Sequence, residues 1–78
     1  MQAMLFDKEI DTCGLNCPLS ILCVKKALAD MASGQVLKVV ATDPGSVRDF
    51  KAFAKQTGNE LVAQHTVERE FIHYLKRR

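Results

Sequence analysis

The hydrophobic pattern of the chain changes within the stretch Cys13-Gly14-Leu15-Asn16-Cys17-Pro18-Leu19-Ser20. Before it, apolar and polar residues alternate from Leu5 to Thr12, and this period of two predicts a strand with one buried face. After it, apolar residues recur at helical spacing, at Ile21, Val24, Leu28 and Met31. The stretch therefore joins a strand to a helix and sets the first β-α unit of the fold.

Cys17 and Pro18 stand where this helix is predicted to begin. Proline is favoured at the first helical position, because an N–H at that position would have no partner within the helix. Pro18 is thus predicted at N1 and Cys17 at the N-cap. A thiolate at an N-cap faces unpaired backbone N–H groups and the positive end of the helix dipole. Such cysteines titrate at roughly 3.5–7.5 instead of about 8.5, which makes Cys17 the candidate reactive thiol.

The middle of the chain predicts an interior strand followed by a second helix. Ser33-Gly34 is predicted to end the first helix with a left-handed glycine. Residues 36–41 are rich in valine and almost continuously apolar, as in a strand with neighbours on both sides. After the turn Asp43-Pro44-Gly45, Ser46 with Asp49 three residues later resembles a capping box, which predicts a helix that Ser46 caps and Gly58 ends.

Residues 61–66 and 71–76 predict two further strands joined by a short turn. The order is β-α-β-α-β-β, and because crossover connections are right-handed, both helices should cover the same face of the sheet. We therefore expect one domain, residues 1–78, built as a two-layer α/β sandwich (α+β) with a four-stranded mixed sheet. Its predicted core contains Ile21, Val24, Leu28, Phe50 and Phe53.

The composition indicates a small globular protein without an electrostatic signal for nucleic acid. The chain has 78 residues, is 47% hydrophobic and 26% charged, and carries a formal net charge of +2. No apolar run approaches the roughly 18 residues of a membrane span, and the N-terminus lacks the pattern of a secretory signal. Three cysteines argue against a disulfide framework. The expected location is the cytoplasm.

Several short motifs together resemble one family. Gly-Leu-x-Cys-Pro opens the first helix at Gly14, and Lys-Lys-Ala-Leu follows from Lys25; Asp-Pro-Gly-Ser then precedes the second helix, and Gly-Asn-Glu-Leu follows it. From about Ile10 to the C-terminus, the chain resembles the TusA/SirA-like (YedF-like) family of small sulfur carriers. The resemblance implies the β-α-β-α-β-β fold and a persulfide on one cysteine. By position that cysteine is Cys17, supported by Gly14, Pro18 and Leu19.

The resemblance also implies partners. A cysteine desulfurase or a rhodanese-like enzyme would donate the sulfur, and acceptor proteins would use it for tRNA thiolation, cofactor sulfuration or sulfur metabolism. The protein is then expected to be a transfer partner more than a stand-alone enzyme. It should need no cofactor and should not bind nucleic acid directly or a membrane. It should be a monomer or a weak homodimer, with Lys25 and Lys26 as a candidate docking patch.

Ser20 departs from the family pattern. The family signature is Cys-Pro-x-Pro, and Ser20 stands in place of the second proline. A proline at N3 has no N–H, so Ser20 restores a donor that an N-cap sulfur can use, and it adds a hydroxyl. This predicts a more stabilised Cys17 thiolate; the alternative is simple tolerance, because the first turn of a helix accepts either residue.

The other cysteines and the histidines leave alternatives open. Cys13 either resolves an oxidised Cys17 as a disulfide or is a small, partly buried residue at a strand end. Cys23 lies roughly 240° around the helix from Cys17 and is expected to be an incidental thiol. His65 and His73 are expected to be ordinary sheet residues, and their even separation across a turn would allow them to be cross-strand neighbours. Structural zinc needs four ligands, which this set does not supply, so no metal is expected.

Two functional alternatives to sulfur transfer follow from these residues. The first is a thiol redox module in which Cys13 and Cys17 cycle through a disulfide. The second is a regulatory or RNA-contacting domain without thiol chemistry, whose affinity would depend steeply on salt.

Overall fold

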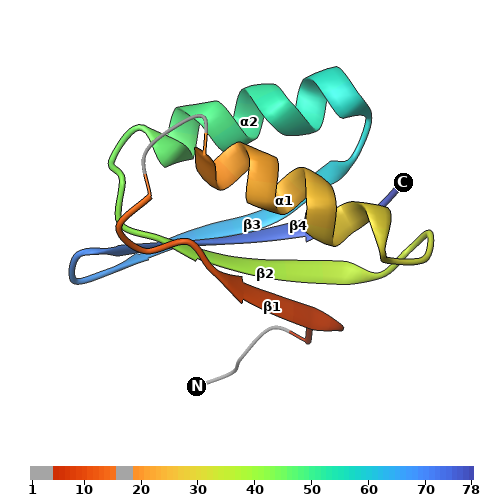
Figure 1. The fold of residues 1–78 in the computed structure, drawn as a ribbon, viewed down its shortest axis with the longest axis horizontal. Coiled ribbons are helices and arrows are strands. Elements are labelled where there is room, and N and C mark those ends of the chain that lie inside the picture. Colours follow the sequence, from red (N-terminus) through yellow and green to blue (C-terminus); the bar gives the residue numbers. More distant parts are fainter. Residues whose placement is uncertain (1–4, 16–18) are drawn as a thin grey trace.

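The elements follow one another in the predicted order (Figure 1). The computed structural model describes residues 5–15 and 19–78. The strands and helices are β1 (Lys8–Asp11), α1 (Leu19–Ala29), β2 (Val36–Ala41), α2 (Ser46–Thr57), β3 (Glu60–Val67) and β4 (Glu70–Lys76). Within the described residues, neither helix has the length and apolar character needed to cross a membrane.

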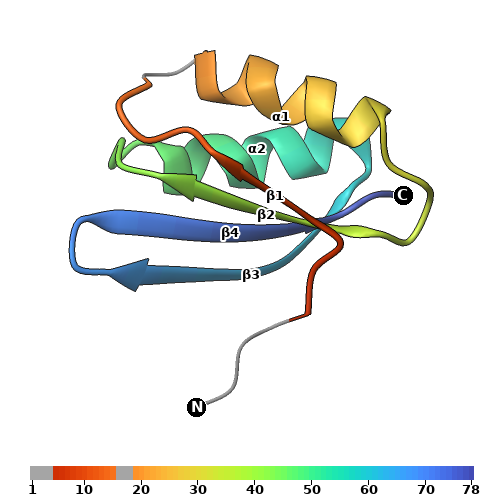
Figure 2. The same cartoon turned by 60° about the horizontal axis from the view of Figure 1, so that its bottom comes forward.

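The four strands form one mixed sheet in the order β1-β2-β4-β3. β1 runs parallel to β2, whereas β4 pairs antiparallel with both β2 and β3. β2 is therefore an interior strand, as its apolar sequence predicted. Both helices lie on one face of the sheet and the other face is open (Figure 1, Figure 2). The predicted two-layer sandwich is confirmed.

The core fills the space between the helices and the sheet. Alternate residues of β2, namely Leu37, Val39 and Ala41, are buried, because successive side chains of a strand point to opposite faces. Four of the five predicted core residues are buried, and Ile21 packs against the core while remaining partly exposed. The main core cluster consists of Val24, Ala27, Leu28, Met31, Leu37, Val39, Phe50, Phe53, Ala54 and Leu75.

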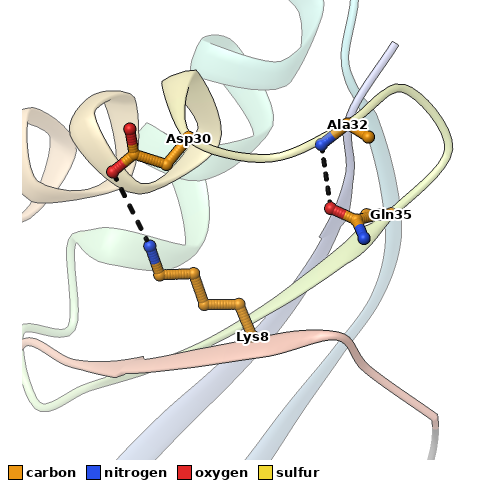
Figure 3. Close-up of polar contacts among 4 residues, drawn as sticks. All are labelled: Lys8, Asp30, Ala32 and Gln35. Carbon is orange, nitrogen blue, oxygen red and sulfur yellow. Dashed lines mark hydrogen bonds and ion pairs between the residues drawn. The ribbon is translucent and has the colours of Figure 1, made fainter.

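The prediction for the end of α1 was wrong. The helix ends at Ala29 and not at Ser33-Gly34. A salt bridge at 4.0 Å joins Lys8 of β1 to Asp30, the residue after the helix, and the backbone N–H of Ala32 donates to the Gln35 side chain at 2.8 Å (Figure 3). Met31 lies after the end of the helix but is buried. In the sequence, its spacing from Leu28 therefore resembled a further helical turn.

Gly34 has the predicted left-handed backbone, but it serves a different turn. Its φ angle is +89°, and its N–H donates to the carbonyl of Arg77 at 2.8 Å. The N–H of Arg77 in turn donates to the carbonyl of Gln35 at 2.8 Å. The glycine therefore leads the chain into β2 beside the end of β4, where a side chain with a Cβ would strain the backbone.

The prediction that Ser46 caps α2 was also wrong. The N-cap residue is Gly45, and among the described residues no side-chain hydrogen bond caps this helix end. Ser46 is the first residue of the helix and is buried, and its hydroxyl lies 3.0 Å from Nε2 of His73 on β4. The hydroxyl thus joins α2 to the sheet instead of closing the helix end. Gly58 ends α2 as predicted, with a φ of +80° and its N–H bonded to the carbonyl of Ala54.

His73 holds α2 against the sheet. The amide nitrogen of Gln64 lies 3.0 Å from Nδ1 of His73 and also donates to the carbonyl of Val47 on α2 at 3.1 Å. Because that nitrogen is a donor, Nδ1 accepts and Nε2 carries the proton that is donated to Ser46. The ring also packs on Phe50 at 4.2 Å between centroids. Burial of this neutral ring lowers the pKa of His73 from 6.5 to about 4.

The two histidines are sheet residues on β3 and β4, as expected, but they are not cross-strand neighbours. In the observed register, His73 pairs with Gln64, and His65 pairs with Ile72. Adjacent residues of a strand point to opposite faces, so His73 faces the helices while His65 lies on the open face. There His65 is exposed and meets Tyr74 edge to face.

The His73 network predicts that acid destabilises the fold before most carboxylates titrate. The folded pKa of about 4 lies below the unfolded value of 6.5, so the unfolded chain binds more protons between these limits. Stability is fully present above pH 6.5 and falls as the pH approaches 4, by up to about 3 kcal/mol. Urea unfolding at several pH values measures this loss. His65→Gln should keep this slope and His73→Gln should flatten it; equal slopes in the two variants would refute the assignment.

The core predicts a large cost for truncating Leu28. Leu28→Ala should lower the free energy of unfolding by about 2–5 kcal/mol, because it removes buried methyl groups and leaves a cavity. Leu22→Ala, on the same helix but at a side chain that is 53% exposed, should change it by less than about 0.5 kcal/mol. Urea unfolding of both variants is the measurement. Similar losses would show that Leu28 is not a core residue.

Candidate functional site

The predicted N-cap and N1 residues, Cys17 and Pro18, lie outside the described residues, so these assignments stay predictions. The structure describes the chain on both sides of them. Before them, the described chain runs from β1 to Leu15. After them, α1 begins at Leu19. The contacts of these two flanking segments show how the fold positions the chain on either side of the predicted site.

The turn after β1 is tied to the end of β2. Both the backbone N–H and the hydroxyl of the buried Thr12 donate to the carbonyl of Val40, at 2.7 and 2.9 Å. The backbone N–H of Gly14 donates to the Thr42 hydroxyl at 2.9 Å. Gly14 has a φ of +84°, a conformation that side chains with a Cβ rarely adopt. The motif glycine therefore has a structural reason, since it lets this turn close onto the neighbouring strand.

Ser20 and Leu19 point in different directions at the start of α1. Leu19 is 52% exposed, whereas Ser20 is 1% exposed and faces inward. Within residues 5–15 and 19–78, the Ser20 hydroxyl has no hydrogen-bond partner. A buried hydroxyl without a partner is destabilising, so the residue at this position is not explained by the contacts of the described fold.

Cys13 lies in a setting that keeps its thiol protonated. Its backbone N–H donates to Oδ1 of Asp11 at 2.9 Å. Interaction of the thiol with the Asp11 carboxylate raises the pKa of Cys13 to about 11, with smaller effects from burial and from the charges of Asp11 and Glu70. The same contacts lower the pKa of Asp11. Sequence reasoning missed Asp11, although an acid two residues before a cysteine was visible.

The outer face of α1 carries exposed apolar and basic side chains. Leu22 is 53% exposed, and Lys25 and Lys26 are exposed without an ion pair to any described residue. Cys23 is also exposed on this helix, which agrees with an incidental thiol on its flank. This face, defined by Leu19, Leu22, Lys25 and Lys26, contains the basic pair that was predicted as a docking patch.

No metal centre is visible in the part of the chain that the structure describes. Groups of three or more His, Cys, Asp or Glu placed to share an ion do not occur among those residues. His73 is enclosed by its own hydrogen bonds to Ser46 and Gln64, and His65 faces away from it on the open side of the sheet.

Comparison with known proteins places this arrangement in a family. A protein of Allochromatium vinosum described as sulfur carrier protein TusA is 72% identical over 57 residues, which are 73% of this chain and 75% of that protein. A TusA of Pseudomonas entomophila is 33% identical over the whole chain and 98% of its own length. A putative sulfur carrier protein of Bacillus subtilis is 44% identical over 78% of this chain and 81% of its own.

A solved structure and a family model agree with these relatives. The crystal structure of a SirA-like protein from Desulfitobacterium hafniense superimposes with a TM-score of 0.79 at 22% identity, over 90% of this chain and 96% of that one, and so shows the same fold. The family model described as sulfurtransferase TusA matches residues 8–77. This protein therefore belongs to the TusA family.

Proposed function

We propose that this protein is a sulfur carrier that holds sulfur as a persulfide on Cys17. The carrier role follows from the family, whose relatives at 72% and 33% identity are named sulfur carriers. The assignment to Cys17 rests on one observation, the motif Gly14-Leu15-x-Cys17-Pro18 directly before α1. We expect the protein to work in the cytoplasm, between a donor such as a cysteine desulfurase or rhodanese-like enzyme and an acceptor protein.

The transfer step needs only one thiolate. The Cys17 thiolate attacks the outer sulfur of a persulfide on the donor, the donor S–S bond breaks, and the donor cysteine leaves as a thiolate. Cys17 then carries an anionic persulfide, and an acceptor nucleophile repeats the exchange. The first N–H groups of a helix have no partner within it, and together with the dipole they favour an anion at its N-terminus. No acid or base side chain is required for this proposal.

The setting of Cys13 supports a single-thiol carrier over a redox module. A thiol with a pKa of about 11 is protonated near neutral pH, and the thiolate is the form that attacks sulfur. Cys13 is therefore a poor resolving residue for an oxidised Cys17. The Asp11 carboxylate beside Cys13 is the physical cause, since it favours the neutral thiol over a second negative charge.

The outer face of α1 is the proposed docking surface for the donor and the acceptor. It begins at Leu19, two residues after Cys17, so a partner that contacts it also approaches the predicted thiol. Exposed Leu19 and Leu22 offer apolar contact, and Lys25 and Lys26 offer positive charge without competing ion pairs in the described chain. A partner surface with apolar residues and an acidic rim would complement it.

The carrier role predicts that sulfur loads onto Cys17 alone. Incubation with a cysteine desulfurase and cysteine should add the mass of one sulfur atom, which a reductant removes, and intact mass spectrometry measures this. Cys17→Ser should not load, whereas Cys13→Ser and Cys23→Ser should load like the parent chain. Loading of Cys17→Ser together with failure of Cys13→Ser would move the carrier role to Cys13.

Ser20 is proposed to tune the thiol through its backbone. If Cys17 is the N-cap, the N–H groups of Leu19 and Ser20 are the donors at N2 and N3. A proline at position 20, as in the family signature, removes the second donor. The buried Ser20 hydroxyl, which has no partner among the described residues, is an additional and separate feature. Substitution of Ser20 by proline or by alanine tests the effect of its N–H and of its hydroxyl separately.

Ser20→Pro should raise the pKa of Cys17 by on the order of one unit, because it removes one charge-assisted hydrogen bond. Ser20→Ala keeps the N–H and should leave that pKa unchanged. It should stabilise the fold by about 1 kcal/mol, because it removes a buried hydroxyl that has no partner in the described part of the chain. Thiolate absorbance against pH, in a background with Cys13→Ser and Cys23→Ser, measures the pKa. An unchanged pKa in Ser20→Pro would leave tolerance as the explanation of Ser20.

A further inference from the structure

A hollow of about 240 Å³ lies where α1 and α2 end and β4 leaves the sheet. Its basic lining residues are Lys25, Arg77 and Arg78, and its apolar lining includes Leu28 and Phe53. We propose that this hollow binds a small phosphate monoester. The hollow shares Lys25 with the proposed docking surface, but it adjoins the C-terminal end of α1, whereas Cys17 precedes the N-terminal end of that helix in the sequence. The 11 residues of α1 span about 16 Å.

The charge of the hollow favours a dianion. Among the described residues its lining contains no acidic side chain, and the three basic side chains form no ion pairs there. Ala29 and Thr57, the last residues of the two helices, also line it, and each helix end carries about half a negative charge. The side chains of the lining therefore favour an anion. A phosphate monoester carries nearly two negative charges and several acceptor oxygens, so it can pair with more than one of these basic side chains, which a carboxylate does less well.

Arg77 is held in place by its backbone. Its N–H donates to the carbonyl of Gln35 and its carbonyl accepts from the N–H of Gly34, both at 2.8 Å. In its side chain, Nη1 donates to the carbonyl of Arg78 at 3.3 Å, and Nε is buried without an acceptor in the described part of the chain. A buried guanidinium N–H without an acceptor is costly, and a bound oxyanion beside it would offset that cost.

Arg78 is fixed by a second set of contacts. Its backbone N–H donates to the Asn59 side-chain oxygen at 2.9 Å, and the Asn59 amide donates to the Thr57 hydroxyl at 2.8 Å. Its guanidinium lies over Gly58, where an added Cβ would come within 2.9 Å of Nη1. The backbones of the two arginines are therefore held at the hollow before any ligand arrives, which reduces part of the entropic cost of binding.

The apolar part of the lining predicts an organic group on the phosphate. Leu28 and Phe53 are core residues that also line the hollow, so part of its surface is apolar. A free phosphate ion would contact only the basic part. A ligand with a short apolar or aromatic group beside its phosphate would use both parts and should bind more tightly than inorganic phosphate.

Titration of the full-length chain with phenyl phosphate at constant ionic strength tests this site, with backbone amide NMR as the readout. We expect saturable shifts at Ala29, Asn59 and Arg78, tighter binding than inorganic phosphate, and weaker binding of benzoate. Arg77→Gln should weaken binding about tenfold or more. Lys51→Gln removes the same charge from an exposed position of α2 outside the hollow and should leave binding unchanged.

Three results would overturn the proposal. One is the absence of saturable shifts with phenyl phosphate, and another is an equal affinity of Arg77→Gln and Lys51→Gln, which would indicate general charge attraction. The third is benzoate binding as tightly as phenyl phosphate, which would replace the phosphate by a carboxylate. If Arg77→Gln does not keep a native spectrum, Arg78→Gln takes its place. Sulfur loading on Cys17 is measured separately and does not depend on these outcomes.

Discussion

The parallel pairing of β1 with the buried strand β2 is the constraint on which the site depends. Each of these strands is followed by a helix on the same face, so both helices begin at the same end of the sheet (Figure 2). In α/β folds the crevice beyond the carboxyl ends of parallel strands is the usual place for function. Here the hydrogen bond from Gly14 to Thr42 joins the two strand-to-helix connections. The connection that contains Cys17 is thereby anchored on its N-terminal side by the fold itself.

Periodicity predicted the elements because it reports burial, and burial is what forms this sheet and its helices. The alternation around Ile10 and the apolar run of residues 36–41 identified both parallel strands. The same dependence explains the error at α1: Met31 is buried from a loop, and a buried loop residue cannot be told from a helical one by spacing. Patterns of this kind locate elements well and their ends poorly.

Local capping rules failed at Ser46 because its partner is distant in sequence. A serine hydroxyl can hydrogen-bond the backbone of its own helix end or a group elsewhere in the fold. Here it bonds His73, which is 27 positions away in the sequence, and this contact is buried. The identity of His73 as a buried neutral ring likewise depends on Gln64, Phe50 and α2 around it, which no single segment contains. At the candidate sulfur site, the sequence motif predicted Cys17. The basic hollow at Arg77 and Arg78 could not be predicted in this way, because only the fold brings the ends of the two helices and of β4 together.

The two cysteines of the site region are expected to differ in the electrostatic surroundings of their thiols. Cys13 lies beside the Asp11 carboxylate, where a thiolate would add a second negative charge, and its pKa rises to about 11. Cys17 precedes a helix N-terminus, where a thiolate is expected to be stabilised by the partial positive charge. We therefore expect the pKa values of these two thiols, four residues apart, to be shifted in opposite directions. A carrier gains from this division, because a second thiolate within reach would attack the persulfide, form a disulfide and release the sulfur before the acceptor arrives.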